Sequence, residues 1–458
     1  MMSFDNLGLR ADLLGRLEAT EKTQATPIQS EAIPEILKCR DVMGLAQTGT
    51  GKTLAFGLPI IHQLLNAGEP CTPHTTHALI LAPTRELAAQ IHESLATLCK
   101  GLSMRLRLVV GGVSINPQIK KLEGGMHILV ATPGRLLDLI DQKALRLDQV
   151  RHLVLDEADQ MLDLGFIHAL RRIAKLVPRE RQTLLFSATM PNQMAEIAGA
   201  FLTDPVRIQV ASPGKTADRI DQSVIFAENN AKPDVLARLL GDHRDDLALV
   251  FARTKHGSDK LAKRLEQAGY KVAAIHGNKS QNQRTRALES FRSGELKVLV
   301  ATDVAARGID IPDVRHVYNY EMPNVPDTYV HRIGRTARAG RDGRAVSLCS
   351  AEEVADLKAI EKLIGNRIRV AGGEQPPAAV AAAANAAARQ ARGSRGGRGG
   401  DKAGAVGAFK DRGERSGAGK SGGAGRGGPA SKGAAGKPSG ASKPKSGAPR
   451  RRSGARQG

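Results

Sequence analysis

The stretch Leu153-Val154-Leu155-Asp156-Glu157-Ala158-Asp159 joins a short apolar run directly to three carboxylates. A continuous apolar run of this length is typical of a strand buried on both faces of a parallel sheet. Carboxylates at the end of such a strand need partners, because burying a charge is costly unless it is paired. Asp156 and Glu157 are therefore candidate reacting groups, with an exposed acidic turn that caps the next helix as the alternative.

A glycine-rich loop, Ala46-Gln47-Thr48-Gly49-Thr50-Gly51-Lys52-Thr53, lies upstream, between the apolar run Val42–Leu45 and a helical segment, Leu54–Leu65. Glycines let backbone N–H groups close around phosphates at a helix N-terminus. The loop alone also fits a plain turn before a helix, and it does not separate kinases, motors and helicases. Together with the carboxylate pair, it predicts a nucleoside triphosphatase.

The chemistry of these residues assigns each a role. Lys52 would neutralise the β- and γ-phosphates, and Thr53 would offer its hydroxyl to Mg²⁺. Asp156 would hold the same ion through its water shell, while Glu157 would orient and deprotonate the attacking water. Lys52, Asp156 and Glu157 are thus predicted catalytic residues, and Thr53 and Asp156 the predicted metal-binding pair.

Short apolar runs alternate with amphipathic helical segments through residue 370, which predicts parallel sheets covered by helices on both faces. The runs form two series, so we expect an α/β protein with domains over 1–205 and 219–370. Turn residues over 203–205 and 212–215 predict a linker over 206–218. The expected strands are Val42–Leu45, Ala78–Ala82, Leu108–Val110, His127–Ala131, His152–Leu155, Thr183–Phe186, Ser223–Phe226, Ala248–Phe251, Val272–Ile275, Val298–Ala301, His316–Tyr320 and Ala345–Cys349.

Positive charge is concentrated near the C-terminus. The net charge is +21, and residues 371–458 carry 18 lysines and arginines against 4 aspartates and glutamates. Apart from an alanine-rich run over 378–388, this region is mostly Gly, Ser, Ala, Lys and Arg, and cannot bury enough apolar surface to offset its ordering entropy. We expect a disordered basic tail over 371–458. Its charge favours polyanions, above all nucleic acid, although a tail that only aids solubility is the alternative.

The composition also indicates the cellular location of the protein and the redox state of its thiols. No apolar run approaches the ~20 residues needed to cross a bilayer, and the N-terminus lacks a secretory pattern. The four cysteines are scattered, and Cys71 lies near His74 and His77 without a fourth ligand. We therefore expect a cytoplasmic protein with reduced thiols and no membrane association. The chain has no Trp and four Tyr, so we expect it to contact the sugar–phosphate backbone of nucleic acid rather than to stack on the bases.

Further motifs surround the loop and the carboxylates in a fixed order. In the first domain they are Thr26-Pro27-Ile28-Gln29, Pro83-Thr84-Arg85-Glu86-Leu87, Gly111-Gly112, Thr132-Pro133-Gly134-Arg135 and Ser187-Ala188-Thr189. In the second they are Phe251-Ala252-Arg253-Thr254, His276-Gly277 with Gln281 and Arg284, Ala301-Thr302-Asp303, Arg307-Gly308-Ile309-Asp310 and His331-Arg332-Ile333-Gly334-Arg335-Thr336-Ala337-Arg338. This set resembles the DEAD-box RNA helicases. Segment 319–326 and the basic tail further resemble the bacterial RhlE subgroup.

The resemblance implies two RecA-like domains and an RNA-stimulated ATPase that uses ATP and Mg²⁺. Arg335 and Arg338 would be arginine fingers reaching the γ-phosphate from the second domain, a contribution of roughly 10³–10⁵ in rate. The family usually has an aromatic residue seven positions before Gln29, where this chain has Lys22, whereas Phe4 matches its isolated upstream aromatic. Weaker ATP affinity or looser base selection is therefore expected. The implied nucleotide-binding residues are Gln29, Thr48, Gly49, Thr50, Gly51, Lys52, Thr53, Gly308 and Asp310.

The resemblance also assigns residues to RNA and to coupling. The implied RNA contacts are Thr84, Arg85, Gly112, Thr132, Gly134, Arg135, Arg253, Thr254, Arg284 and Thr302. The residues implied in coupling hydrolysis to strand separation are Asp159, Ser187, Thr189 and His331. Hydroxyls, backbone amides and guanidiniums read phosphate and ribose rather than base identity. Taken singly, each of these residues could instead be a helix cap or a turn residue.

The expected function is local unwinding of short RNA duplexes, or remodelling of RNA–protein complexes, driven by closure of two domains on ATP and single-stranded RNA. A DNA-translocating helicase and an ATP-gated RNA clamp that rarely turns over are the alternatives. RNA bound without sequence preference is the expected partner, and ribosomal precursors and the RNA-decay machinery both fit.

Overall fold

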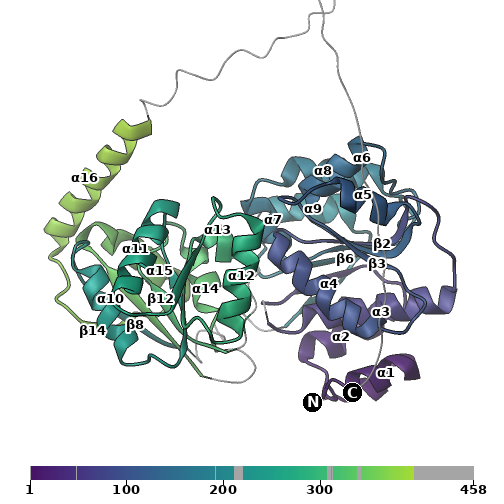
Figure 1. The fold of residues 1–458 in the computed structure, drawn as a ribbon, viewed down its shortest axis with the longest axis horizontal. Helices are drawn as coiled ribbons and strands as arrows, with labels where there is room; N and C mark the ends of the chain where they lie inside the picture. The colour runs from purple at the N-terminus through teal and green to yellow at the C-terminus, as the bar shows by residue number, and fades with distance from the viewer. Residues whose placement is uncertain are drawn as a thin grey trace, which may run out of the picture. The chain divides into compact units, whose positions relative to one another are not determined.

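Two parallel sheets of seven strands each form the core of the protein. The computed structural model describes residues 2–47, 49–190, 192–210, 220–306, 311, 313–337 and 342–396. Helices cover both sheets (Figure 1). We call residues 2–210 the first lobe and residues 220–396 the second lobe. The expected α/β class and its division into two sheets are confirmed.

The first lobe contains a sheet with the strand order β3-β4-β2-β5-β6-β1-β7. Its strands are β1 (Val42–Leu45), β2 (Thr76–Leu81), β3 (Leu106–Val109), β4 (Met126–Ala131), β5 (His152–Leu155), β6 (Gln182–Ser187) and β7 (Val206–Gln209). Its helices are η1 (Phe4–Leu7), α1 (Ala11–Glu18), α2 (Pro27–Leu37), α3 (Lys52–Ala67), α4 (Arg85–Cys99), α5 (Asn116–Leu122), α6 (Pro133–Asp141), α7 (Ala158–Asp163), α8 (Ile167–Leu176) and α9 (Asn192–Phe201).

Both faces of the first sheet are buried, as its apolar strands predict. Val154 of β5 packs in a cluster with residues of α2, α3 and α4. Its neighbours Leu153 and Leu155 pack with residues of α6, α8 and α9 in a second cluster. Successive side chains of a strand point to opposite faces, so an uninterrupted apolar run is what a sheet covered on both sides requires.

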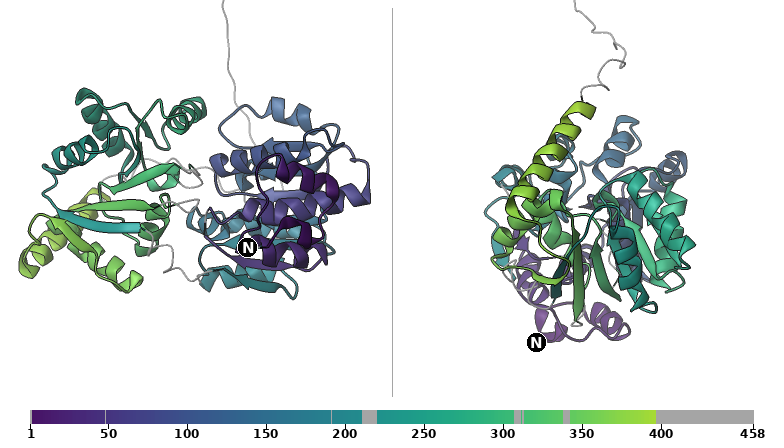
Figure 2. Two further views of the ribbon diagram at one scale, coloured as in Figure 1. Left: turned by 90° about the horizontal axis from the view of Figure 1, so that it is seen from below. Right: turned by 90° about the vertical axis from the view of Figure 1, so that its left-hand side faces the viewer.

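The second lobe repeats this arrangement with the strand order β10-β11-β9-β12-β13-β8-β14. Figure 2 shows the strands of this sheet side by side. Its strands are β8 (Ile220–Phe226), β9 (Leu247–Phe251), β10 (Val272–Ile275), β11 (Val298–Ala301), β12 (Val314–Asn319), β13 (Gly343–Cys349) and β14 (Arg369–Gly372). Its helices are α10 (Lys232–Gly241), α11 (Lys255–Gln267), α12 (Gln281–Arg292), α13 (Asp303–Ala306), α14 (Pro326–Ile333), η3 (Ala351–Glu353), α15 (Val354–Ile364) and α16 (Ala378–Gly396).

The structure corrects two of the expected boundaries. The expected linker over 206–218 began too early, because Val206–Gln209 forms β7 and pairs with β1. The expected tail over 371–458 also began too early, because β14 ends at Gly372 and α16 follows it. Ala381 of α16 is buried with residues of α14 and α15, which anchors this alanine-rich helix to the second lobe. The remainder of the predicted tail lies outside the described residues.

Most of the predicted site segments follow a strand at its carboxyl end, whereas segment 26–29 precedes β1 and segment 331–335 lies in and after α14. In a parallel sheet these ends share one edge, which is where open α/β sheets bind their ligands. Among the described residues, no helix has the length and apolar character needed to span a membrane.

Candidate nucleotide and RNA site

The glycine-rich loop leads from β1 into α3, and its conformation depends on glycine. Gly49 and Gly51 have φ values of 87° and 91°, a region that side chains disfavour. A Cβ on Gly51 would lie 2.4 Å from Nε2 of Gln29, so the loop also has no room for one. The loop thus brings backbone N–H groups to the N-terminus of α3, an arrangement suited to phosphate. Thr48 lies outside the described residues.

Lys52 is buried at the start of α3, beside the carboxylates that follow β5. Its Nζ donates to the carbonyl of Ala46 at 3.1 Å and lies 3.9 Å from Oδ1 of Asp156. Burial raises the pKa of the Asp156 carboxyl, and Glu157 raises it further, while Lys52 opposes both effects. Glu157 is also buried and has a left-handed backbone, with φ at 51°. The structure therefore brings together the three residues predicted to be catalytic in the first lobe.

These oxygen donors fit a magnesium ion. Carboxylates and hydroxyls are the hard ligands that Mg²⁺ prefers, and Asp156 and Thr53 both line the same cavity. Burial is the main cause of the raised pKa of Asp156, because it disfavours the ionised carboxylate. A bound cation would stabilise that ionised form.

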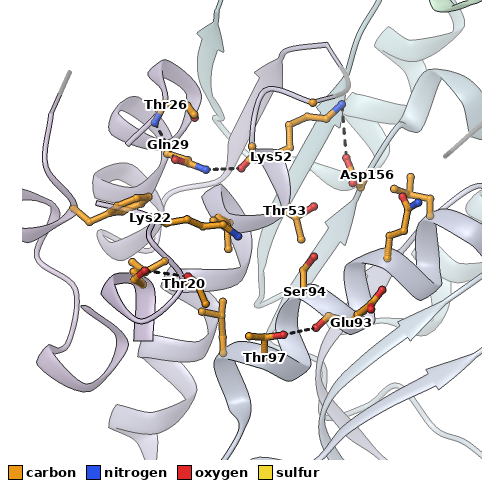
Figure 3. Close-up of a pocket in the computed structure, with 18 of the residues that line it drawn as sticks. Thr20, Lys22, Thr26, Gln29, Lys52, Thr53, Glu93, Ser94, Thr97 and Asp156 are labelled. Atoms are coloured by element: carbon orange, nitrogen blue, oxygen red, sulfur yellow. Dashed lines mark hydrogen bonds and ion pairs between the residues drawn. The ribbon is translucent and has the colours of Figure 1, made fainter. Parts of the chain in front are cut away.

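The cavity next to Lys52 has a volume of about 620 Å³, within the usual range for small-ligand sites. Figure 3 shows Lys22, Gln29, Lys52, Thr53 and Asp156 around it. Gln29 accepts a hydrogen bond from the Thr26 N–H and donates one to the Gly51 carbonyl, both at 2.9 Å. Gln29 therefore links the first motif directly to the glycine-rich loop.

The predicted coupling residues of the first lobe meet around one carboxylate. Oδ2 of Asp159 accepts hydrogen bonds from the backbone N–H groups of Ala188 and Thr189 and from the Thr189 hydroxyl, at 3.2, 2.9 and 3.0 Å. Ser187 donates its hydroxyl to the Thr189 carbonyl at 2.7 Å. The segments that follow β5 and β6 are thus joined by hydrogen bonds.

The residues predicted to contact RNA in the first lobe come from the ends of three neighbouring strands. The Arg85 guanidinium packs on Gly112, where a Cβ would lie 1.8 Å from Nη1. Arg135 donates to the Val113 carbonyl at 3.0 Å. Thr84 caps α4 by accepting from the Leu87 N–H at 3.2 Å. Thr132 precedes α6 without a side-chain capping bond, and Gly134 has open space at its Cβ position.

In the second lobe, the predicted residues are already engaged with their neighbours. The Thr254 hydroxyl caps α11 by accepting from the Gly257 N–H at 3.0 Å. Arg253 donates to the Met322 carbonyl at 2.7 Å and to Glu353 at 3.1 Å. Arg284 donates to the Ala305 carbonyl at 3.4 Å, and Thr302 is buried after β11. The guanidinium of Arg253 is therefore bonded inside the lobe, and its contact with RNA stays a prediction.

The helix α14 carries the predicted His331 and precedes Arg335. Arg335 is buried and lines a small pocket with Phe251, Asp303 and His331. Gly308, Asp310 and Arg338, which the family resemblance also placed in this region, lie outside the described residues.

Arg332 lies in segment 331–338, and the sequence indicates no separate role for it. Its guanidinium pairs with Asp303 at 2.5 and 2.8 Å and donates to Asn319 at 3.1 Å. It is 1% exposed and lies 5.0 Å above the Phe251 ring. Arg332 therefore ties α14 to the strand ends. Its place in segment 331–338 was its signal in the sequence, and that signal did not separate it from Arg335.

Comparison with known proteins agrees with these motifs. The DEAD/DEAH box helicase family matches residues 26–197, and the helicase conserved C-terminal domain family matches residues 231–340. The ATP-dependent RNA helicase CshA of Limosilactobacillus reuteri is 45% identical over 380 residues, which cover 83% of this chain and 75% of that protein. A DEAD-box ATP-dependent RNA helicase CshA of Streptococcus pneumoniae is 46% identical over 368 residues, or 80% and 69% of the two chains.

Solved structures show the same fold. The structure of S. cerevisiae Dbp5 bound to RNA and ADP BeF3 matches with a TM-score of 0.73 and 33% identity, over 81% of this chain and 96% of that one. Mss116p bound to ssRNA and AMP-PNP matches with a TM-score of 0.74 and 29% identity, over 83% and 81%. The chain belongs to the DEAD-box ATP-dependent RNA helicases and is built from two RecA-like domains.

Proposed function

We propose that the first lobe holds Mg²⁺ and the triphosphate of ATP through the residues that meet at the ends of β1 and β5. Lys52 binds the β- and γ-phosphates, and Thr53 and Asp156 hold the ion. Bound Mg²⁺ would offset the negative charge that develops on the phosphate oxygens. Glu157 orients the attacking water and takes its proton. The observation that carries this proposal is the burial of Lys52, Asp156 and Glu157 beside one cavity.

Single-stranded RNA is the proposed partner of the strand ends around Arg85, Gly112 and Arg135 in the first lobe. Dbp5 and Mss116p, which share the fold, have been solved with RNA and ssRNA respectively. The remaining proposed RNA contacts are Thr84, Thr132, Gly134, Thr254, Arg284 and Thr302. Hydroxyls and guanidiniums of this kind contact phosphate and ribose, so binding should not depend on base sequence.

Closure of the two lobes on ATP and RNA would couple hydrolysis to local unwinding of short duplexes. Arg335 and Arg338 would complete the nucleotide site from the second lobe, and Gly308 and Asp310 would lie beside the ribose. The links from Asp159 to Ser187 and Thr189, together with His331, would transmit the state of the nucleotide to the RNA. Because both ligands favour the closed state, each should raise the affinity for the other.

The direct test compares ATPase rates without nucleic acid, with single-stranded RNA and with single-stranded DNA of the same sequence. We expect stimulation by RNA and little by DNA. Equal stimulation by DNA would favour a DNA-translocating helicase of the same superfamily.

Replacing Glu157 by Gln separates an enzyme from an RNA clamp. We expect the E157Q variant to bind ATP and RNA but to lose roughly 10²–10⁴ of its turnover, because it lacks the group that accepts the proton. Normal hydrolysis by E157Q would show that Glu157 is not the base. Wild-type protein with no measurable turnover would favour the clamp.

The subgroup, the cellular location and the RNA substrates can also be proposed. Segment 319–326 and the basic C-terminal composition support an RhlE-like subgroup, whereas the relatives compared above carry the name CshA. We propose a cytoplasmic protein that acts on structured RNA, such as ribosomal precursors or the substrates of RNA decay.

Because α16 packs on the second lobe, the charged tail is best tested by ending the chain at Gly396. That truncation should weaken RNA binding at low salt and leave the RNA-independent ATPase unchanged.

A further inference from the structure

In the described part of the second lobe, two clusters of ionisable side chains include residues that none of the motifs above contains. The first, at the amino ends of β9 and β12, consists of His243, Asp246 and His316. Arg344 contacts Nε2 of His243 at 3.1 Å, and Arg315 lies 3.7 Å from Asp246. Two guanidiniums thus lie against the candidate ligand atoms of this cluster, which disfavours a cation there.

The second cluster lies at the carboxyl edge of the sheet and centres on Glu353. Glu353 is 5% exposed and pairs with Lys232, which is 1% exposed. Lys232 also donates to the carbonyls of Leu348 and Tyr320, at 2.9 and 3.2 Å. All three hydrogens of the ammonium group therefore have an acceptor, which is the condition for keeping a charge buried.

Glu353 in turn holds two of the segments that carry predicted site residues. Its Oε1 accepts from Nη2 of Arg253 and from the N–H of Met322, both at 3.1 Å. Arg253 also bonds to Met322 itself, because its guanidinium donates to the Met322 carbonyl at 2.7 Å. A third link joins the segments directly, because the N–H of Arg253 donates to Glu321 at 2.6 Å.

These two segments lead directly into the site. Arg253 is followed by Thr254, the proposed RNA contact that caps α11. Met322 lies four residues before α14, which carries His331 and precedes Arg335. The carboxylate of Glu353 thus sets the spacing between the end of β9 and the end of β12.

We propose that Glu353 is a positioning residue for the helicase reaction, and that Arg253 acts through it rather than by binding an RNA phosphate. Glu353, neutralised by Lys232, holds Arg253 and Met322 so that Thr254 and α14 present their side chains in one fixed arrangement. This inference rests on the proposed function, since it takes Thr254 and α14 to face RNA and nucleotide. Misplacing such groups by about 1 Å can cost up to about 100-fold in rate.

Replacing Glu353 by Gln, with Glu352→Gln as the matched control, tests the positioning role. Glu352 is the neighbouring residue and is exposed. We expect E353Q to lower the RNA-stimulated kcat/KM by roughly 10- to 100-fold, while the Kd for ATP measured without RNA changes little, because the triphosphate is then held by Lys52 of the first lobe. Equal RNA-stimulated rates in the two variants would overturn the proposal. Wild-type protein that RNA does not stimulate would instead overturn the proposed function.

A double variant separates positioning from simple loss of stability. Exchanging both members of a buried ion pair for apolar residues is often neutral for stability, whereas removing one member is costly. We therefore expect Lys232→Met/Glu353→Leu to regain much of the Tm that E353Q loses. It should keep the low RNA-stimulated rate, because nothing holds Arg253 and Met322. Recovery of the rate together with the Tm would show that Glu353 is only structural.

The salt dependence of RNA binding tests Arg253 by a second route. A side chain that binds a phosphate of single-stranded RNA contributes about 0.7 to the slope of log K against log salt concentration. We expect Arg253→Gln to weaken RNA-stimulated ATPase without changing this slope, whereas Arg85→Gln should lower it. A slope lowered equally by both substitutions would make Arg253 a phosphate contact and contradict its positioning role. Arg253→Gln should also add little to the loss in E353Q, because both changes break the same link.

Discussion

The two lobes share one fold but use their charged residues in opposite ways. In the first lobe, Lys52 lies 3.9 Å from Asp156, and burial raises the pKa of that carboxyl. In the second lobe, Arg332 pairs with Asp303 at 2.5 Å, and Glu353 is bonded to both Lys232 and Arg253. The first lobe thus has charged groups that a bound ligand can neutralise. The second lobe instead uses ion pairs to fix the geometry of its loops. Substitutions in the first lobe should therefore affect binding and chemistry, and those in the second should affect stability and coupling.

The largest effect is expected for Lys52→Ala. Removing the buried ammonium takes away the positive charge that faces the phosphates and leaves Asp156 without its cationic neighbour. We expect ATP binding to be lost, measured by titration with a fluorescent ATP analogue. The control is Lys38→Ala, because Lys38 is exposed and pairs with Glu35 on the protein surface. Retained ATP binding in K52A would show that the phosphates lie elsewhere.

The second lobe should respond in stability, and Asp303→Asn tests this. Losing the opposite charge of a fully buried pair costs about 3–5 kcal/mol, and the cost here should be smaller, because Arg332 is 1% exposed but Asp303 is 28% exposed. Asn319 and the Glu321 carbonyl still accept from Arg332, so we expect a loss at or below the lower end of that range in denaturant unfolding. Asp234→Asn is the control, because its pair with Arg264 is exposed and worth about 0–1 kcal/mol. Equal losses in the two variants would remove the contrast between the lobes.

The raised pKa of Asp156 predicts a pH dependence confined to the first lobe. Above its raised pKa the carboxyl is ionised and attracts Mg²⁺, whereas below it the carboxyl is neutral and binding must displace a proton. The affinity for Mg·ATP should therefore fall as the pH is lowered from about 7 to about 5, a range that an ordinary Asp with a pKa near 3.9 would not affect. Isothermal titration of wild-type protein and Asp156→Asn checks this. The same pH dependence in both would exclude Asp156.

The smallest effect is expected at Lys22, which lines the nucleotide cavity where the family usually has an aromatic residue. Lys22→Phe would add a ring that can stack on adenine, and such contacts are worth about 0.5–1.5 kcal/mol. We expect the KM for ATP to fall about 2- to 10-fold. Lys22→Ala separates gain of the ring from loss of the amine. An unchanged KM in K22F would place the base away from residue 22.

The sequence predicted the sheets well, and its two misses share a physical cause. The predicted strands were recognised as continuous apolar runs, which form where both faces are covered. The missed strands β7 and β14 are edge strands, and most of their residues are partly or fully exposed. They carry polar residues, so they did not stand out from the linker and the tail. The other two edge strands, β3 and β10, contain apolar runs and were predicted, so the pattern overlooks only those edge strands whose residues are largely polar or exposed.

The chemistry of the first lobe could be anticipated from local sequence, because its site is built from short segments with fixed spacing. The glycine-rich loop, the Asp156-Glu157 pair and Gln29 each carry their chemical meaning in a few neighbouring residues. The cluster in the second lobe carries no such signal. Lys232, Arg253 and Glu353 are far apart in the chain and meet only because three parallel strands end at one edge. The sequence by itself determined which groups the protein contains and the order of its strands and helices. Only the tertiary structure decided which charges are left for ligands and which are paired, because that depends on distances set by packing.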